Sequence, residues 1–253
     1  LPRAPEIERE RGVQVRIFLT TEEVPFAGHP TLGTAAWLYC NHPVFGGAEQ
    51  ITLDLGIGPI TVRFTPPQHC EQGVFGTMTQ KDPIFGEICN SREDREALAA
   101  ALNLSTHDLD PNLPAQVMST GLTFCIVPLR SLEVAARLRI PPQPARAYLD
   151  RIGARFFYCI TRADSTSGAD WHARMQFETG EDPATGSASG CTAAYLVRHG
   201  LAASGQPIVI EQGIEMLRPS RIHVSAAIED GVVTKVFVGG RTIPVACGRF
   251  FLP

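Results

Sequence analysis

The 253-residue sequence lacks several features that mark common protein classes. Its 22 basic residues do not exceed its 26 acidic ones, and the net charge of −4 gives no basic surface for nucleic acid or an anionic membrane. It has no run of about 18 apolar residues, so no membrane-spanning helix is expected. Only Lys81 and Lys235 are lysines, which leaves few candidates for a Schiff base. These absences favour a soluble globular protein without a nucleic-acid or membrane partner.

Cysteine is present, but not in metal-binding motifs. The seven cysteines are odd in number, none forms a Cys-x-x-Cys pair, and several lie in apolar runs such as 124–126. This pattern predicts free thiols in a reducing compartment, hence a cytoplasmic protein, and argues against a structural zinc site. The chain begins at Leu1 without methionine or a signal peptide, so we expect its gene to encode residues before Leu1.

Hydrophobic periodicity predicts a chain rich in strands with a few helices. A domain boundary is expected near 110–120. Strands are expected at 13–19, 51–55, 60–64, 74–78, 122–129, 154–162, 208–211, 222–226, 232–238 and 249–252, and helices at 91–102, 131–138 and 144–152.

Two segments, 25–40 and 180–197, resemble each other and indicate an internal duplication. Aligned at His29 and Asp182, each continues with a proline and then a helix of small residues. Proline suits the first helical position, so His29 and Asp182 are expected to be the N-cap residues. Neither helix carries a charge along its length, which predicts that both are buried on all sides. We therefore expect two similar halves, each a strongly curved β-sheet wrapped around a central helix.

Two such helix starts facing one cleft would form a site for a small anion, because their backbone N–H groups are unpaired. Gly28, Gly33 and Gly186 would let a ligand approach the backbone closely, and Thr34 and Ser187 add hydroxyl groups.

Simpler interpretations of these residues stay open at this point. Aspartate is among the best N-caps, so Asp182 alone indicates a structural role. His29 is either a hydrogen-bonded core histidine or a group that transfers protons at neutral pH. Ser187 lacks the G-x-S-x-G context of a serine hydrolase.

Several motifs, in order along nearly the whole chain, resemble those of the phenazine-biosynthesis-type (PhzF-like) isomerases. The resemblance implies the α/β roll of diaminopimelate epimerase, with two pseudo-symmetric halves, each a mostly antiparallel sheet around a helix. The motifs are Glu23–Ala35, Ser119–Leu122, Val127–Leu132, Gly180–Ala188, Glu211–Ser220 and Val238–Gly240.

The first roll is expected over residues 1–114, completed by a C-terminal strand at 243–253, and the second roll over 115–242. The resemblance also implies a homodimer that moves a proton on a small carboxylate-bearing substrate between the rolls, without a cofactor or metal.

The family's active-site histidine, aspartate and serine correspond to His29, Asp182 and Ser187. The substrate-binding backbone positions correspond to Gly28, Gly186 and Gly213.

The sequence departs from the family pattern at two points. Leu217 stands where the family usually has glycine, so its side chain is expected to narrow the cleft or move a loop. The family's base, a glutamate in an Asn-Leu-Ser-Glu motif, is expected on an N-terminal segment absent from this chain. The segment Asn103–Thr106 ends in threonine instead of glutamate and is not that motif.

Two other functions follow from these departures. A chain without the glutamate could be a ligand-binding homologue that has no catalytic activity. A racemase or epimerase of the same fold would place two thiols at the helix starts, whereas Cys40 and Cys191 lie further along the helices.

Overall fold

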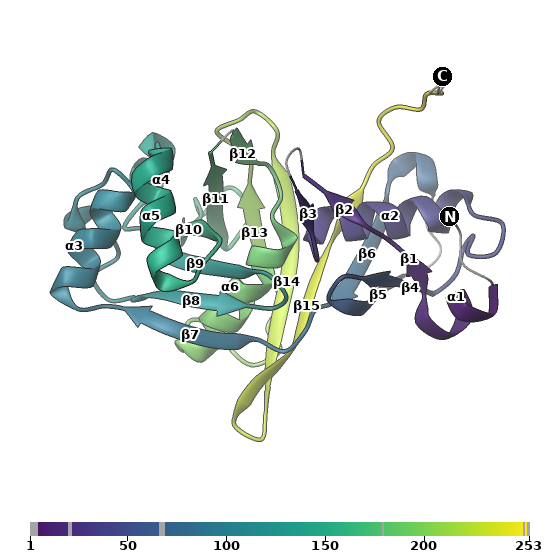
Figure 1. Cartoon of the computed structure of the whole chain (residues 1–253), viewed down its shortest axis with the longest axis horizontal. Helices are drawn as coiled ribbons and strands as arrows, with labels where there is room; N and C mark the ends of the chain where they lie inside the picture. Colours follow the sequence, from purple (N-terminus) through teal and green to yellow (C-terminus); the bar gives the residue numbers. More distant parts are fainter. Residues whose placement is uncertain (1–4, 20–21, 66–68, 179, 250, 252–253) are drawn as a thin grey trace.

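The computed structural model describes residues 5–19, 22–65, 69–178, 180–249 and 251, and shows two lobes joined by long strands (Figure 1). The helices are α1 (Pro5–Arg11), α2 (Gly28–Asn41), α3 (Arg92–Ala101), α4 (Leu132–Arg137), α5 (Pro142–Ile152) and α6 (Gly186–Arg198). The strands are β1 (Val13–Gln14), β2 (Ile17–Phe18), β3 (Glu23–Val24), β4 (Gln50–Leu55), β5 (Gly58–Phe64), β6 (Val74–Thr79), β7 (Ile84–Cys89), β8 (Ala115–Ser119), β9 (Thr123–Pro128), β10 (Phe156–Arg162), β11 (Trp171–Phe177), β12 (Gly180–Asp182), β13 (Ile208–Gln212), β14 (Ser220–Glu229) and β15 (Val232–Thr242).

Most strands join one continuous sheet that runs through both lobes. Among the described residues its order is β1-β4-β5-β6-β15-β14-β13-β11-β10-β9-β8-β7, with β12 paired to β11. The pairs β1/β4, β9/β10 and β11/β13 are parallel, and the other pairs are antiparallel. The strands β14 and β15 lie between the lobes, and β15 pairs with β6 of the first lobe (Figure 1). The predicted, mostly antiparallel α/β roll architecture is confirmed.

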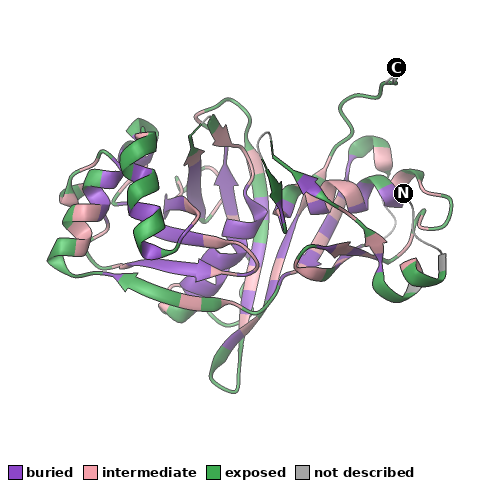
Figure 2. Cartoon of the chain, in the orientation of Figure 1, coloured by how far each residue is buried: buried purple, intermediate pink, exposed green. Residues whose placement is uncertain are grey.

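The helix α6 is enclosed by the second lobe, as its lack of charge predicts. Every residue from Gly186 to Val197 is buried, and the helix packs on β8, β9, β14 and β15 (Figure 2). The helix α2 is enclosed less completely. Its Ala35 and Leu38 face the core, but Trp37 is 59% exposed. The prediction of a helix buried on all sides is therefore right for α6 and wrong for one face of α2.

A second hydrophobic cluster lies under α3, α4 and α5. Ser91 caps α3 with a reciprocal pair of hydrogen bonds to Asp94, which explains why this helix start was predictable. Strand β7 pairs with β8 and contributes Cys89 to this cluster. Residues 84–114 thus pack with the second lobe, and the chain crosses between lobes near residues 80–83, earlier than the expected boundary at 114.

Other sequence expectations differ from the structure locally. The predicted strand 13–19 is divided into β1 and β2, and strand β15 ends at Thr242. Residues 243–249 and 251 form no strand, so the expected C-terminal strand at 243–253 is wrong over those residues. Residues 250, 252 and 253 lie outside the described residues. Strands β7, β8 and β11 were not predicted.

The expectation that all cysteines are free thiols is wrong for two of them. Cys40, near the end of α2, forms a disulfide with Cys70. The other cysteines are free, and only Cys247 among them is exposed.

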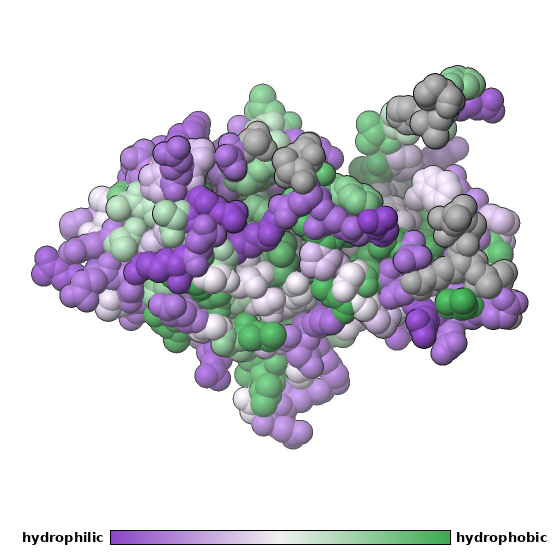
Figure 3. Space-filling model, in the orientation of Figure 1, coloured by the Kyte–Doolittle hydropathy of each residue, from purple (hydrophilic) through white to green (hydrophobic). Residues whose placement is uncertain are grey.

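No helix in the described ranges is long and apolar enough to cross a membrane. Exposed apolar side chains gather at the tip of the β14–β15 hairpin, where Ile228 is 44% and Val232 63% exposed (Figure 3).

Candidate active site

The N-termini of α2 and α6 meet between the lobes. Gly28 and Gly186 are the first residues of the two helices, and both are buried. A Cβ atom added to Gly28 would lie 2.6 Å from Cα of Gly186 and 2.7 Å from the backbone N of Ser187. Only glycine permits this approach, which brings the positive ends of two helix dipoles together.

The predicted N-cap residues are wrong for both helices. Ala27 and Thr185 occupy the N-cap positions, so His29 is the second residue of α2. Asp182 is the last residue of β12, where pairing with Met175 of β11 keeps it extended. Counted from the helix starts, His29 corresponds to Ser187 and not to Asp182.

Both helix starts keep backbone donors available. Within the described part of the chain, neither Ala27 nor Thr185 makes a side-chain cap hydrogen bond. The N–H groups of the first turn have no intrahelical acceptor, and those of Gly28, His29, Gly186 and Ser187 lie at this junction. An anion bound there would offset the repulsion between the two positive helix ends.

The imidazole of His29 is oriented across the cleft by the opposite lobe. Its Nδ1 lies 2.8 Å from the backbone oxygen of Ala184 and 3.7 Å from a carboxylate oxygen of Asp182. Because a carbonyl oxygen can only accept a hydrogen bond, Nδ1 carries a proton and donates a hydrogen bond to the backbone oxygen of Ala184. Nε2 has no partner among the described residues and is left to act on a ligand. The side chain is 55% exposed, against 18% for Asp182.

The carboxylate of Asp182 is held by the residues that precede α6. Its Oδ1 accepts a hydrogen bond from the backbone N of Ala184 at 3.3 Å, and its Oδ2 accepts one from the hydroxyl of Thr185 at 2.9 Å. These two hydrogen bonds fix the short turn that precedes α6 and leave the N–H groups of its first turn free. Asp182 thus combines the structural role expected from its residue type with a position beside His29.

The side chain of Gln212 fixes the direction of these hydrogen bonds. Its Oε1 accepts from the backbone N of Thr185 at 3.0 Å and from the hydroxyl of Tyr158 at 3.0 Å. Its Nε2 donates to the backbone oxygen of Asp182 at 2.6 Å and to the Thr185 hydroxyl at 2.9 Å. Since that hydroxyl already accepts from Gln212, its own proton points to Asp182. Gln212 is fully buried, and its role could have been sought in the 211–220 motif that contains it.

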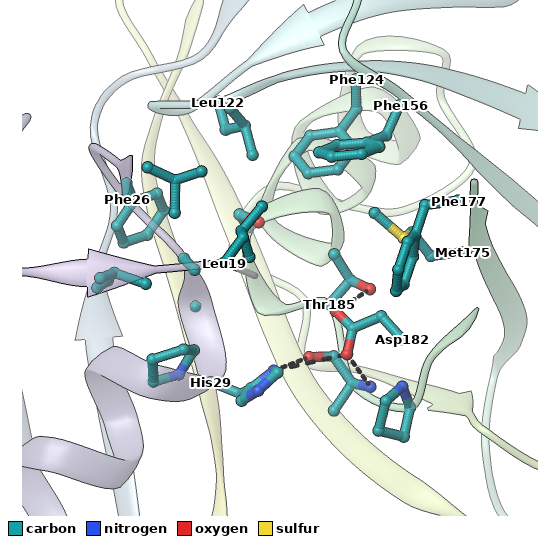
Figure 4. A pocket seen from close by; sticks show the side chains of 18 of the residues that line it. Leu19, Phe26, His29, Leu122, Phe124, Phe156, Met175, Phe177, Asp182 and Thr185 are labelled. Atoms are coloured by element: carbon teal, nitrogen blue, oxygen red, sulfur yellow. Dashed lines mark hydrogen bonds and ion pairs between the residues drawn. The ribbon is translucent and has the colours of Figure 1, made fainter. Parts of the chain in front are cut away.

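A cavity of about 370 Å³ opens beside these groups (Figure 4). Of the predicted site residues, Gly28, His29, Asp182 and Ser187 line it. Ser187 is 3% exposed.

Two other predicted site residues lie just outside the cavity. Gly186 lies directly behind Gly28 and does not line the cavity. Gly213 does not line it either, but adopts a left-handed conformation (φ +82°) against the backbone oxygen of Pro183. Gly33 and Thr34 are further along α2 and away from the cavity.

An ionic network backs the cavity on the outer face of β11. Arg174 is 2% exposed and holds Glu181 through two hydrogen bonds of 2.8 and 2.6 Å. His172 lies between Glu211 and Glu215, with ring nitrogens 3.3 and 2.9 Å from their carboxylates.

This network shifts the titration of two of its members. Burial lowers the pKa of His172, but the hydrogen bonds and charges of Glu215 and Glu211 outweigh it, so the pKa is raised above its usual value. Burial raises the pKa of Glu215, and His172 and Arg174 reverse the shift, so its pKa is lowered. The contact with His172 anchors the loop that follows β13.

The geometry also bears on Leu217, on the cysteines and on groups that could hold a metal. The side chain of Leu217 is 92% exposed in a left-handed conformation (φ 58°) and does not narrow the cavity. No cysteine is among the described residues that line it, since Cys40 is bonded to Cys70 and Cys191 is buried in α6. The described residues include no group of three or more His, Cys, Asp or Glu placed to hold a metal ion.

Comparison with known proteins identifies relatives over nearly the whole chain. Residues 4–248 match the family described as "Phenazine biosynthesis-like protein" (PhzC-PhzF). An uncharacterized isomerase of Mesorhizobium japonicum is 30% identical, over 94% of this chain and 80% of that protein. The trans-2,3-dihydro-3-hydroxyanthranilate isomerase of Pseudomonas aeruginosa is 31% identical, over 97% of this chain and 81% of that protein. The solved structure of a predicted epimerase from Pseudomonas aeruginosa is 35% identical, covers 95% of this chain and 80% of that one, and gives a TM-score of 0.79.

Proposed function

We propose, since the chain belongs to the phenazine biosynthesis-like PhzC-PhzF family, that it is an isomerase that moves a proton on a small carboxylate-bearing substrate. In this proposal the reaction uses the protein's own side chains and no cofactor. The observation that carries it is the placement of His29, with Nδ1 bound to Ala184, beside Asp182 and the joined helix starts.

The geometry supports His29 as a group that exchanges the proton, and in the full-length protein the glutamate expected before Leu1 would share this transfer. A carbon-bound proton of the substrate passes to Nε2, because Nδ1 already carries its own proton. The electron pair of the broken C–H bond shifts a double bond. The half-exposed imidazole exchanges its new proton with water, and a proton then returns from Nε2 to another carbon, so substrate and product have the same composition. Asp182 stabilises the imidazolium, and the N–H groups of Gly28 and Ser187 would hold the substrate's carboxylate.

The proposal is tested by measuring, with chromatography, the rate at which the full-length protein converts trans-2,3-dihydro-3-hydroxyanthranilate. His29→Ala and Asp182→Asn should each lower the rate by about 10²-fold or more, as is typical for general acid–base groups. Two matched substitutions far from the cavity, His107→Ala and Asp150→Asn, should leave the rate unchanged.

Different outcomes would overturn different parts of the proposal. A wild-type rate for His29→Ala would place the proton-transferring group elsewhere in the protein. Binding of carboxylates with no conversion of any would favour a ligand-binding homologue instead.

A homodimer is part of the same proposal. The apolar tip of the β14–β15 hairpin supports a contact with a second copy, because Ile228 and Val232 are exposed there. Light scattering of the purified chain should give twice its mass of 27.4 kDa, whereas a mass of one chain would contradict the dimer.

A further inference from the structure

The side chain of Gln80, which does not line the cavity, lies against the start of α6. Gln80 directly follows β6, where the chain crosses between the lobes, and it is buried. Its backbone N donates to the backbone oxygen of Val236 at 2.9 Å, so it continues the pairing of β6 with β15. Side chains two residues apart in a strand share a face, so Gln80 points the same way as Met78. The Cε of Met78 lies 3.2 Å from a Cβ added to Gly186, which places both side chains at the helix start.

Gln80 fits a notch in α6 that two glycines form. Gly186 and Gly190 are four residues apart and therefore lie on one face of the helix. The Nε2 of Gln80 donates to the backbone oxygen of Gly186 at 3.0 Å. A Cβ added to Gly190 would lie 2.0 Å from Oε1 of Gln80, so only glycine admits the amide at this position. The notch and the hydrogen bond together fix where α6 begins relative to the end of β6.

The hydroxyl of Thr120 sets the orientation of this amide. The carbonyl oxygen of Gly186 can only accept a hydrogen bond, so the amide nitrogen faces it. The Oε1 of Gln80 then accepts from the hydroxyl of Thr120 at 2.7 Å, and both side chains are buried. The backbone oxygen of Ser187, 3.3 Å away, is a second acceptor for that hydroxyl. Without Gln80, the hydroxyl would turn to Ser187, and the oxygen of Gly186 would lose its side-chain partner.

The start of α6 is thus held from both lobes. Within the second lobe, Gln212 accepts a hydrogen bond from the backbone N of the N-cap residue Thr185. Gln80 holds Gly186 from the end of β6. Strand β6 belongs to the first lobe and packs against α2, the helix that carries His29. The Gln80 amide therefore connects the two helices whose starts meet beside the cavity.

We infer that Gln80 is a positioning residue, which sets the distance between the starts of α2 and α6 and with it the orientation of His29. Nδ1 of His29 is bonded to the backbone oxygen of Ala184, two residues before α6. A shift of the helix start moves this acceptor and therefore the imidazole. A displacement of about 1 Å can lower a rate by about 10²-fold, so a smaller shift should lower kcat by about tenfold. The expected effect on kcat rests on the proposed function, whereas the effect on the imidazole does not.

Two glutamine variants test this inference. Gln80→Met keeps the length of the side chain and loses both hydrogen bonds, so it should lower kcat for trans-2,3-dihydro-3-hydroxyanthranilate by about tenfold or more. Gln116→Met is the matched control, because Gln116 is equally buried and its Oε1 lies 3.0 Å from Nε2 of His199 at the other end of α6. It should keep the wild-type kcat. Both rates are measured on the full-length protein at a temperature where circular dichroism shows each variant to be folded.

Two threonine variants keep the inference testable if Gln80→Met does not fold. Thr120→Val keeps the shape of the side chain and removes the hydroxyl, so it should lower kcat by about fivefold, as expected for one lost hydrogen bond. Thr120→Ser removes a methyl group and keeps the hydroxyl, so it should retain the wild-type kcat. If Thr120 acted through packing alone, the two variants would rank in the reverse order, and that result would overturn the inference.

The nitrogen NMR signals of the His29 imidazole give a readout that does not depend on the reaction. In alkaline buffer the wild type should show a protonated Nδ1 and an unprotonated Nε2, and the two signals are assigned by their loss in His29→Ala. Gln80→Met and Thr120→Val should shift both signals towards those of a free imidazole, which mixes its tautomers. Gln116→Met should leave them unchanged.

The two readouts separate failure of the inference from failure of the proposed function. Unchanged imidazole signals in Gln80→Met and Thr120→Val would overturn the inference whatever the rates, and so would a wild-type kcat in both variants. An equal loss of kcat in Gln80→Met and Gln116→Met would also overturn it. A wild-type protein that converts no acid would overturn the proposed function, and the imidazole signals would still decide whether Gln80 positions His29.

Discussion

Substitution of Gly28 by alanine tests whether the close approach of the two helix starts is required. The added Cβ would lie 2.6 Å from Cα of Gly186. Carbon atoms in contact are about 3.5–4.0 Å apart, so the helices would have to separate by about 1 Å. Overpacking of this kind costs about 1–3 kcal/mol of stability. A displacement of about 1 Å in an active site can lower a rate by about 10²-fold, and we expect a loss of that size here.

Gly33 supplies the matched control for this prediction. It lies in the same helix, and a Cβ added there meets no atom within 4 Å. Gly33→Ala should therefore keep the wild-type rate and raise the free energy of unfolding by about 0.5–1 kcal/mol, because alanine favours the helix interior. Urea unfolding and the conversion assay described above measure both variants. If Gly28→Ala shows wild-type stability and a wild-type rate, the contact is dispensable and the reasoning is refuted.

Three further predictions concern Gln212, His172 and the disulfide. Gln212→Met removes the partners of the backbone N of Thr185 and the backbone oxygen of Asp182, so it should lower the free energy of unfolding by about 2–6 kcal/mol and lower conversion. Gln116→Met, at another buried glutamine, should lower stability only. Unchanged conversion by a folded Gln212→Met variant would contradict this prediction. The pKa of His172 is raised in the folded protein above the ordinary histidine value of about 6.5 that applies in the unfolded chain. Its contribution to stability is therefore complete below pH about 6.5 and is lost as pH rises through the raised, folded-state pKa. Urea unfolding across pH 6–9 should show that loss in the wild type and not in His172→Gln. Thiol titration of the unfolded, unreduced chain should find five thiols and not seven, and removal of the 40–70 disulfide should cost about 3–4 kcal/mol.

The elements that were predictable are those whose signal is local. Alternation of apolar and polar residues marks β4 and β5, and the Ser91 capping box marks the start of α3. Strand β8 lacks alternation because it is almost entirely buried. Strand β11 does alternate, from Trp171 to Phe177, but its polar face carries His172 and Arg174 in a buried network. That alternation is a local signal for a strand, and it lies outside the strands expected above.

The helix starts show why boundaries are harder to predict than elements. A proline after His29 and after Asp182 favours a helix that begins at the proline. Instead α2 begins two residues before Pro30, and α6 begins three residues after Pro183. Pairing of β12 with β11 holds Asp182 in a strand, and this competing interaction depends on residues that no local pattern reveals.

The site itself depends on contacts between distant parts of the chain. The sequence identifies His29, Asp182 and Ser187 through a motif, and the structure brings them to one cavity. The hydrogen bond that sets the tautomer of His29 joins residues 155 positions apart, to Ala184. The role of Gln212 likewise arises from the pairing of β13 beside β11. Such contacts follow from the strand order and not from residue spacing.

The most direct test of the account is the isotopic composition of a substrate turned over in heavy water. If His29 takes a carbon-bound proton and a proton is returned to another carbon, product formed by the wild-type protein should carry one solvent deuterium per turnover, detected by mass spectrometry. His29→Ala should incorporate that label at least about 10²-fold more slowly. Complete conversion without any deuterium in the product, or labelling by His29→Ala at the wild-type rate, would contradict the account.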